Sequence, residues 1–131
     1  MSAHNLQTRY RAYVTLAETA EAAQDWRGAA VDFYSAYCEH PSKWDETPSA
    51  AQSADREALL TRSRENWAKH LGAFKIGKRI RIPSGMGGVF DGVCSRIDGE
   101  RIFLIIDNPQ YPDWHGREYS AHYQDARRFE A

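Results

Sequence analysis

The spacing of apolar residues changes once along this chain, and the change divides the chain into two kinds of structure. Before Gly72, apolar residues recur every three or four positions, which is the period of an α-helix. After Gly77 they alternate with polar residues, which is the period of a β-strand with one face in water. The pattern predicts a helical domain over residues 1–73 and a β domain over residues 74–131.

Two apolar stripes with helical spacing lie in the first forty residues. The first consists of Leu6, Tyr10, Tyr13, Ala17 and Ala20, and the second of Trp26, Ala29, Ala30, Phe33 and Tyr37. Asp25 is a good N-cap for the second helix, and Pro41 cannot continue it. A connection this short predicts an antiparallel helical hairpin, with small residues such as Ala29 and Ala36 at the contact.

Aromatic, small and proline residues follow a fixed order in this hairpin, at Tyr13, Leu16, Ala17, Ala20, Ala29, Phe33, Ala36 and Pro41. In order and spacing these positions resemble one tetratricopeptide repeat. The chain departs from that family at Ala20, where a larger aromatic is common, and at Gln24, where glycine is usual. Because one such unit cannot bury its own face, the resemblance implies a hairpin rather than a superhelical peptide-binding groove.

The segment Asp25-Trp26-Arg27-Gly28-Ala29-Ala30 is also similar to a signature of short bacterial regulators of the PerC/ANR type. Those proteins have an Ala-rich helix, this turn into a second helix, and a third helix that carries Arg and Trp. The similarity covers about half of the chain and implies a bacterial regulatory protein.

A third helix is predicted from Pro48 to about Leu71, with Thr47 as its cap, after a loop at 42–46. Its inner stripe is Leu59, Leu60, Ser63, Trp67, His70 and Leu71. This helix either covers the open side of the hairpin or leaves a groove for a partner helix.

The β domain contains four predicted strands, at 78–82, 89–97, 101–107 and 118–123. Gly92 predicts a bulge or sharp bend, and Asp98-Gly99 predicts a hairpin turn. The strand at 101–107 is apolar on both faces, so we expect cover on both sides, with the helical half as one cover.

The stretch from Lys78 to Val93, with its glycine-rich bend, resembles the opening hairpin of SH3-like barrels. Together with the helices, this resemblance implies an α+β fold, in which a three-helix N-terminal half packs on a small C-terminal SH3-like antiparallel β-barrel.

Charge and composition exclude several classes of protein. The formal net charge is −1, so no global field would draw the chain to nucleic acid or to an anionic membrane. No apolar run approaches the roughly 20 residues that span a bilayer, and the N-terminus lacks a signal-peptide core. We therefore expect a cytoplasmic protein.

Candidate chemistry is sparse. The glycine turn at 84–88 lacks the Lys and the following helix of a phosphate-binding loop. Two groups could supply metal ligands, Asp113, His115 and His122 in one half and Cys38 and His40 in the other, but their spacing is not that of a structural zinc site. Cys94 has no neighbour that would activate a thiol. We expect no catalytic residue, no metal and no cofactor.

Aromatic residues and arginines gather near the C-terminus. The candidate binding residues are Tyr111, Trp114, Arg117, Tyr119 and Tyr123, together with Arg79 and Arg81 of the first strand. These aromatics either close the ends of the barrel, contact a partner protein or peptide, or stack on single-stranded nucleic acid. SH3-like barrels bind ligands, including extended Pro-rich peptides, on loop aromatics.

The sequence therefore favours a small non-enzymatic adaptor or regulator that acts through protein contact. A nucleic-acid-binding regulator that uses the basic strand is the alternative, and an enzyme with a Cys/His site is the third possibility. The partner and the oligomeric state are not encoded in any motif.

Overall fold

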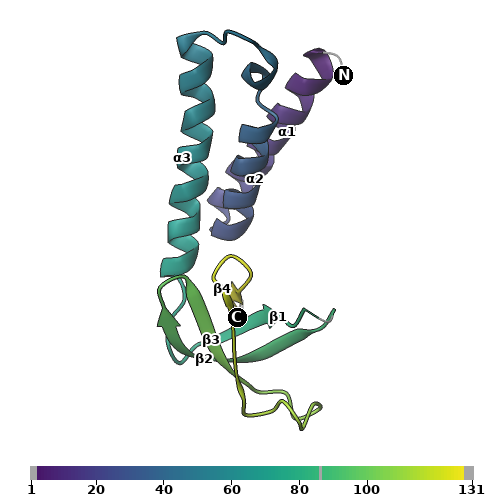
Figure 1. Ribbon diagram of the computed structural model, residues 1–131, viewed down its shortest axis with the longest axis vertical. Coiled ribbons are helices and arrows are strands. Elements are labelled where there is room, and N and C mark those ends of the chain that lie inside the picture. The colour runs from purple at the N-terminus through teal and green to yellow at the C-terminus, as the bar shows by residue number, and fades with distance from the viewer. Residues whose placement is uncertain (1–2, 86, 129–131) are drawn as a thin grey trace. The chain divides into compact units, whose positions relative to one another are not determined.

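The computed structural model describes residues 3–85 and 87–128 and shows an α+β protein, in which three α-helices precede an antiparallel sheet (Figure 1). This order, predicted from the change in apolar spacing, is confirmed. The chain forms two compact units, Met1–Lys69 and His70–Ala131. Among the described residues, no helix is long and apolar enough to cross a membrane.

The first unit begins with a helical hairpin of α1 (Ala3–Ala22) and α2 (Trp26–Cys38), which pack side by side (Figure 1). The chain reverses at Gln24, which has a left-handed φ of 61°. Asp25 caps α2 as predicted, because its carboxylate accepts a hydrogen bond from the N–H of Gly28 at 3.0 Å.

A small apolar cluster holds the hairpin together. Its buried members are Ala17, Ala29, Phe33 and Ala36 of the hairpin and Leu59 of the third helix. The complete burial of Ala29 and Ala36 confirms the predicted close contact of the two helices.

The third helix, α3 (Ala50–Gly72), begins at a different cap from the one predicted. Ser49, rather than Thr47, is the cap: its hydroxyl accepts a hydrogen bond from the N–H of Gln52 at 3.1 Å, and the Gln52 side chain accepts one from the N–H of Ser49 at 2.9 Å. This reciprocal pair is a capping box. The preceding segment, predicted as a loop, contains the short 3-10 helix η1 (Pro41–Trp44).

The contacts of α3 with the hairpin are largely polar. Ser63 donates its hydroxyl to the carbonyl oxygen of Ala30 at 2.7 Å. Glu21 of α1 accepts hydrogen bonds from Asn66 at 2.8 Å and from Arg62 at 2.7 Å. The predicted inner stripe therefore missed Asn66, because a search for apolar spacing does not find a buried amide. Helix α3 covers this side of the hairpin.

The second unit contains a five-stranded sheet in the order β4-β3-β2-β1-β5, with neighbouring strands antiparallel. The strands are β1 (Arg79–Pro83), β2 (Val89–Asp98), β3 (Arg101–Ile106), β4 (Glu118–His122) and β5 (Arg127–Arg128). Strands β4 and β5 are the two edges, and no pairing joins them among the described residues. The sheet is therefore open, and a closed barrel is not confirmed.

The bulge in β2 lies later than predicted. Its register with β3 shifts between Cys94 and Arg96, which leaves Ser95 as the extra residue. Gly92 keeps regular pairing with both neighbouring strands, so the prediction of a bulge there was wrong. Gly92 is needed for a different reason: a side chain at this position would overlap the carbonyl oxygen of Ile105.

The predicted hairpin between β2 and β3 is confirmed. Asp98 pairs with Arg101, and the two turn residues are Gly99 and Glu100. Gly99 has a φ of 59°, a conformation that favours glycine at the first position of such a turn.

One face of the sheet forms the core of the second unit. The buried residues are Phe74, Ile80, Ile82, Phe90, Cys94, Ile102, Leu104, Ile106 and Ala126. The prediction that β3 is buried on both faces was wrong, since Ile105 is 38% exposed and Phe103 is half-buried. The guanidinium of Arg96 lies 3.7 Å from the centre of the Phe103 ring, so a charged side chain covers part of this second face.

The last turn of α3 belongs to the second unit through His70. Its Nε2 lies 3.0 Å from the carbonyl oxygens of both Tyr123 and Ala126, so Nε2 carries the proton and donates to both. The same ring meets Phe74 edge-on with 4.8 Å between centroids. Through these two hydrogen bonds, His70 links the turn before β5 to the end of α3.

Candidate functional site

The second unit contains a pocket of about 170 Å³ lined by aromatic, small and aliphatic residues. Its lining residues are Ser84, Gly88, Val89, Phe90, Tyr111 and Trp114. They come from two segments, the turn between β1 and β2 with the start of β2, and the loop between β3 and β4. No charged residue is among them, so the pocket suits an uncharged group.

Phe90 anchors the pocket to the core. It is 6% exposed, the most buried of the lining residues. Its ring centroid lies 5.7 Å from that of Trp114 and 4.9 Å from that of Tyr119, which it meets edge-on. Tyr119 lies outside the lining and supports it, because its hydroxyl donates to the carbonyl oxygen of Ser84 at 3.3 Å. These contacts hold the pocket's position on the sheet.

The loop between β3 and β4 is held by its own backbone. The N–H groups of Trp114 and His115 both donate to the carbonyl oxygen of Tyr111 at 2.9 Å, and the N–H of Arg117 donates to that of Trp114 at 3.0 Å. Where the loop joins the sheet, the N–H of Gly116 donates to the carbonyl oxygen of Ile106 at 2.8 Å. Little ordering is therefore needed when this loop binds a ligand.

Large apolar surfaces of the pocket remain open to solvent. Tyr111 is 53% exposed, Val89 49% and Trp114 37%. The face of the Trp114 ring also lies near a cation, since the guanidinium of Arg117 is 5.4 Å from its centre. Tyr, Trp and Arg are the residue types that most often dominate the energy of protein interfaces.

The structure brings together only part of the predicted site. Tyr111 and Trp114 line the pocket, and Arg117 and Tyr119 contact or support it. Tyr123 instead packs against the core of the second unit and stacks near His122 with 4.7 Å between ring centroids.

Arg79 and Arg81 are on the exposed face of β1 and not in the pocket. Arg79 pairs with Asp107 at 2.8 Å, and Arg81 pairs with Asp91 at 3.1 Å. The hydrogen bond from Arg79 lowers the pKa of Asp107 below its usual range. Both arginines are therefore neutralised by acids of their own chain.

Phe90, Val89, Ser84 and Gly88 are pocket residues that the sequence analysis did not identify. Ser84 and Gly88 lie at the two ends of the turn between β1 and β2, and Val89 and Phe90 begin β2. At such positions a single sequence does not distinguish pocket lining from core. The clustering of glycines before Val89 was the available signal, since glycine turns often border sites.

The residues considered for metal or nucleophilic chemistry are dispersed. His115 approaches Asp107 at 4.0 Å, and His122 approaches Glu100 at 3.3 Å. Within residues 3–85 and 87–128, no three His, Cys, Asp or Glu side chains are grouped so as to hold a metal ion. Cys94 is buried in the core, and burial raises the pKa of its thiol, which disfavours the reactive thiolate.

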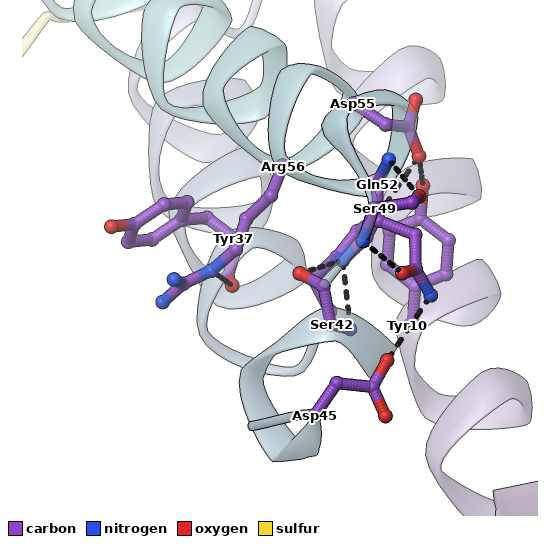
Figure 2. A network of polar contacts seen from close by, with 9 residues as sticks. Tyr10, Tyr37, Ser42, Asp45, Ser49, Gln52, Asp55 and Arg56 are labelled. Atoms are coloured by element: carbon purple, nitrogen blue, oxygen red, sulfur yellow. Dashed lines mark hydrogen bonds and ion pairs between the residues drawn. The ribbon is translucent and has the colours of Figure 1, made fainter. Parts of the chain in front are cut away.

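Figure 2 shows a polar network in the first unit that the sequence analysis did not predict. His40 Nε2 lies 3.0 Å from the carboxylate of Asp55, and His40 Nδ1 lies 2.8 Å from the hydroxyl of Ser42. The Tyr10 hydroxyl donates to the same carboxylate at 3.4 Å, and burial together with Asp55 raises the pKa of Tyr10. The network joins α1, η1 and α3.

The order of Asp55, His40 and Ser42 is that of a catalytic triad, but two observations favour a structural role. The Nδ1 of His40 also accepts the backbone N–H of Ser42 at 3.2 Å, so His40 caps η1 with the lone pair that a general base would need. Ser42 is 5% exposed, which leaves little access to its hydroxyl.

Comparison of the chain with protein-family models, with curated proteins and with solved structures finds no match. The function is therefore inferred from the geometry of the pocket.

Proposed function

We propose that this protein is a small non-enzymatic adaptor or regulator that binds a partner protein through the pocket of Phe90, Tyr111 and Trp114. The observation that carries the proposal is the exposure of Tyr111 and Trp114 on a loop held in place by backbone hydrogen bonds. Rigid, exposed aromatic residues beside a hollow bind a partner with little loss of conformational entropy. The pocket's volume of about 170 Å³ suits one side chain of an extended segment.

We propose in addition that the sheet curls in the manner of an SH3-like barrel. Two features of β2 support this: its first half pairs with β1 and its second half with β3, and the bulge between Cys94 and Arg96 bends it. In such an arrangement, loop aromatics form the ligand surface.

The nucleic-acid alternative needs cations that are available to phosphates. Of the basic residues on which it relied, Lys75, Lys78, Arg79 and Arg81, the two arginines are paired with Asp107 and Asp91. Under the proposed function, partner binding should depend only weakly on salt, whereas binding through several phosphate contacts would weaken steeply as salt rises.

The proposal is tested with Trp114→Ala. Partners captured from the native host by the wild-type chain, and identified by mass spectrometry, should be lost with this variant. Titration with a captured partner should show binding weakened by about 2 kcal/mol or more. Trp44→Ala serves as the matched control, because Trp44 is also exposed but belongs to the first unit.

Thermal unfolding of the same samples separates binding from folding. Because Trp114 is 37% exposed, its truncation should lower stability by less than the roughly 3–5 kcal/mol lost when a core Trp is truncated. Unchanged partner binding by Trp114→Ala, or a loss of stability in the range of a core residue, would contradict the proposal.

A further inference from the structure

Arg117 differs from the other arginines of the second unit in its contacts. Among those whose side chains the structure describes, Arg79, Arg81 and Arg96 pair with Asp107, Asp91 and Glu118, Arg101 donates to Ser120, and Arg127 donates to the carbonyl oxygen of Asp125. The guanidinium of Arg117 lies 5.4 Å from the centre of the Trp114 ring and forms no ion pair with a described residue. Asp113, the nearest acid in the same loop, does not pair with it.

The Trp114 ring keeps the Arg117 guanidinium beside the pocket, because a cation within about 6 Å of a Trp ring is attracted to its face. This attraction leaves the N–H donors of the guanidinium available to other groups. A carboxylate is the group that two parallel guanidinium donors bind best. Because Trp114 also lines the pocket, a ligand side chain in the pocket would bring its neighbouring residues close to Arg117.

We infer that the pocket binds an acidic peptide segment, in which one apolar side chain enters between Phe90, Tyr111 and Trp114 and an adjacent Asp or Glu pairs with Arg117. This inference rests on the proposed function and specifies the partner's chemistry. The uncharged lining selects the apolar side chain, and the guanidinium, which pairs with no acid in the described part of the chain, selects the neighbouring acid.

The test uses the full chain and two sets of short synthetic peptides, acetylated and amidated at their ends. One set has a central Leu, Met, Phe or Pro flanked by Asp on both sides, and the other has the same centre flanked by Asn. Asn has the shape of Asp without its charge, so the pair isolates the carboxylate. Binding is measured by isothermal titration calorimetry, and also by NMR at the indole N–H of Trp114 in the variants that keep this residue.

Peptides flanked by Asp should bind about threefold to fivefold more tightly than their Asn counterparts at low salt, which is the range for an exposed ion pair. The preference should shrink in about 0.5 M salt, because screening acts within a few ångströms there. It should vanish in Arg117→Gln and persist in Arg117→Lys, which keeps the charge. Arg101→Gln is the matched control, since Arg101 begins β3 while the pocket loop follows the end of β3.

Three results would overturn the inference, and they have different consequences for the proposed function. If Asp and Asn peptides bind equally and Trp114→Ala abolishes both, the pocket binds apolar side chains without choosing acidic neighbours. A preference for Asp that survives Arg117→Gln would mean that another residue selects the acid. If neither set of peptides shifts the Trp114 signal, both the inference and the proposed peptide-binding pocket fail.

Discussion

Within the pairing of β2 with β3, Gly92 faces the carbonyl oxygen of Ile105 with no side chain between them. Any larger residue there would push the two strands apart in the middle of the sheet, because the overlapping atom belongs to the backbone and cannot rotate away. The neighbouring core residue Leu104 also lies within 3.0 Å of where a Cβ at Gly92 would be. The role of this glycine is thus steric, and not conformational.

We therefore predict that Gly92→Ala lowers the free energy of unfolding by about 1–3 kcal/mol through overpacking. The measurement is chemical denaturation followed by circular dichroism. Gly72→Ala is the control, because an added Cβ at Gly72 meets nothing within 4 Å, and its stability should change by about 0.5 kcal/mol or less. Equal stability of Gly92→Ala and the wild type would show that the strands can separate locally without loss.

The candidate site could be predicted from the sequence only where residue type was enough. Tyr111, Trp114 and Arg117 were found because aromatic and arginine residues are concentrated in that loop. The pairing of Arg79 and Arg81 could not be predicted, because the acids that neutralise them are distant in sequence and meet them only through strand pairing. Local patterns do not contain such long-range pairs.

Among the elements, helices and strands were predictable to different degrees. The spacing of apolar residues located the hairpin and the strands, and Asp25 marked the start of α2. The capping box of Ser49 and Gln52 has a recognisable sequence pattern. The helix start was instead placed at Pro48, because proline is common at the first helical position. Strand β5 has two residues, too few to show alternation, and it forms only by pairing with the edge of β1.

The attachment of α3 to α1 depends on a charge that sequence patterns did not reveal. Glu21 accepts hydrogen bonds from Asn66 and Arg62, and the bond from Asn66, helped by Arg62, lowers the pKa of Glu21 below its ordinary value of 4.5. The folded protein thus keeps Glu21 ionised at a lower pH than the unfolded chain does. Its contribution to stability is complete above about pH 4.5 and is lost as the pH falls through the lowered pKa.

We predict that Glu21→Gln is less stable than the wild type by about 1 kcal/mol near neutral pH, a value reduced by the partial exposure of the pair. The difference should narrow as the pH falls below about 4.5 and should vanish once Glu21 is protonated in both states. Urea denaturation at a series of pH values measures it. Other acids titrate in the same range, but they do so in both proteins and cancel. A difference that stays constant from pH 7 to about pH 3 would contradict the assigned role of the charge.

At the scale of the whole molecule, one helix belongs to both units. The first unit has the hairpin cluster, to which α3 contributes Leu59, and the second has the sheet core, against which Leu71 of α3 packs. The boundary between the units falls inside this helix, after Lys69. A helix is a cooperative element, because each hydrogen bond depends on the turn before it. Loss of either core should therefore destabilise the helix that the other core uses.

We predict that the two units unfold together. The four tryptophan indole N–H signals report on both, since Trp26, Trp44 and Trp67 belong to the first unit and Trp114 to the second. In a urea titration followed by NMR, all four folded-state signals should disappear with one midpoint, as two-state unfolding requires.

A glycine placed in α3 tests whether the helix carries this coupling. Ala68 is exposed and lies next to the unit boundary, so Ala68→Gly weakens the helix by about 1 kcal/mol without disturbing either core. If α3 couples the units, the variant should lower the midpoints of all four indole signals by the same amount. The Trp114 signal could instead keep its original midpoint while the other three shift. Each core would then be stable without the other, and α3 would connect the two units without coupling their unfolding.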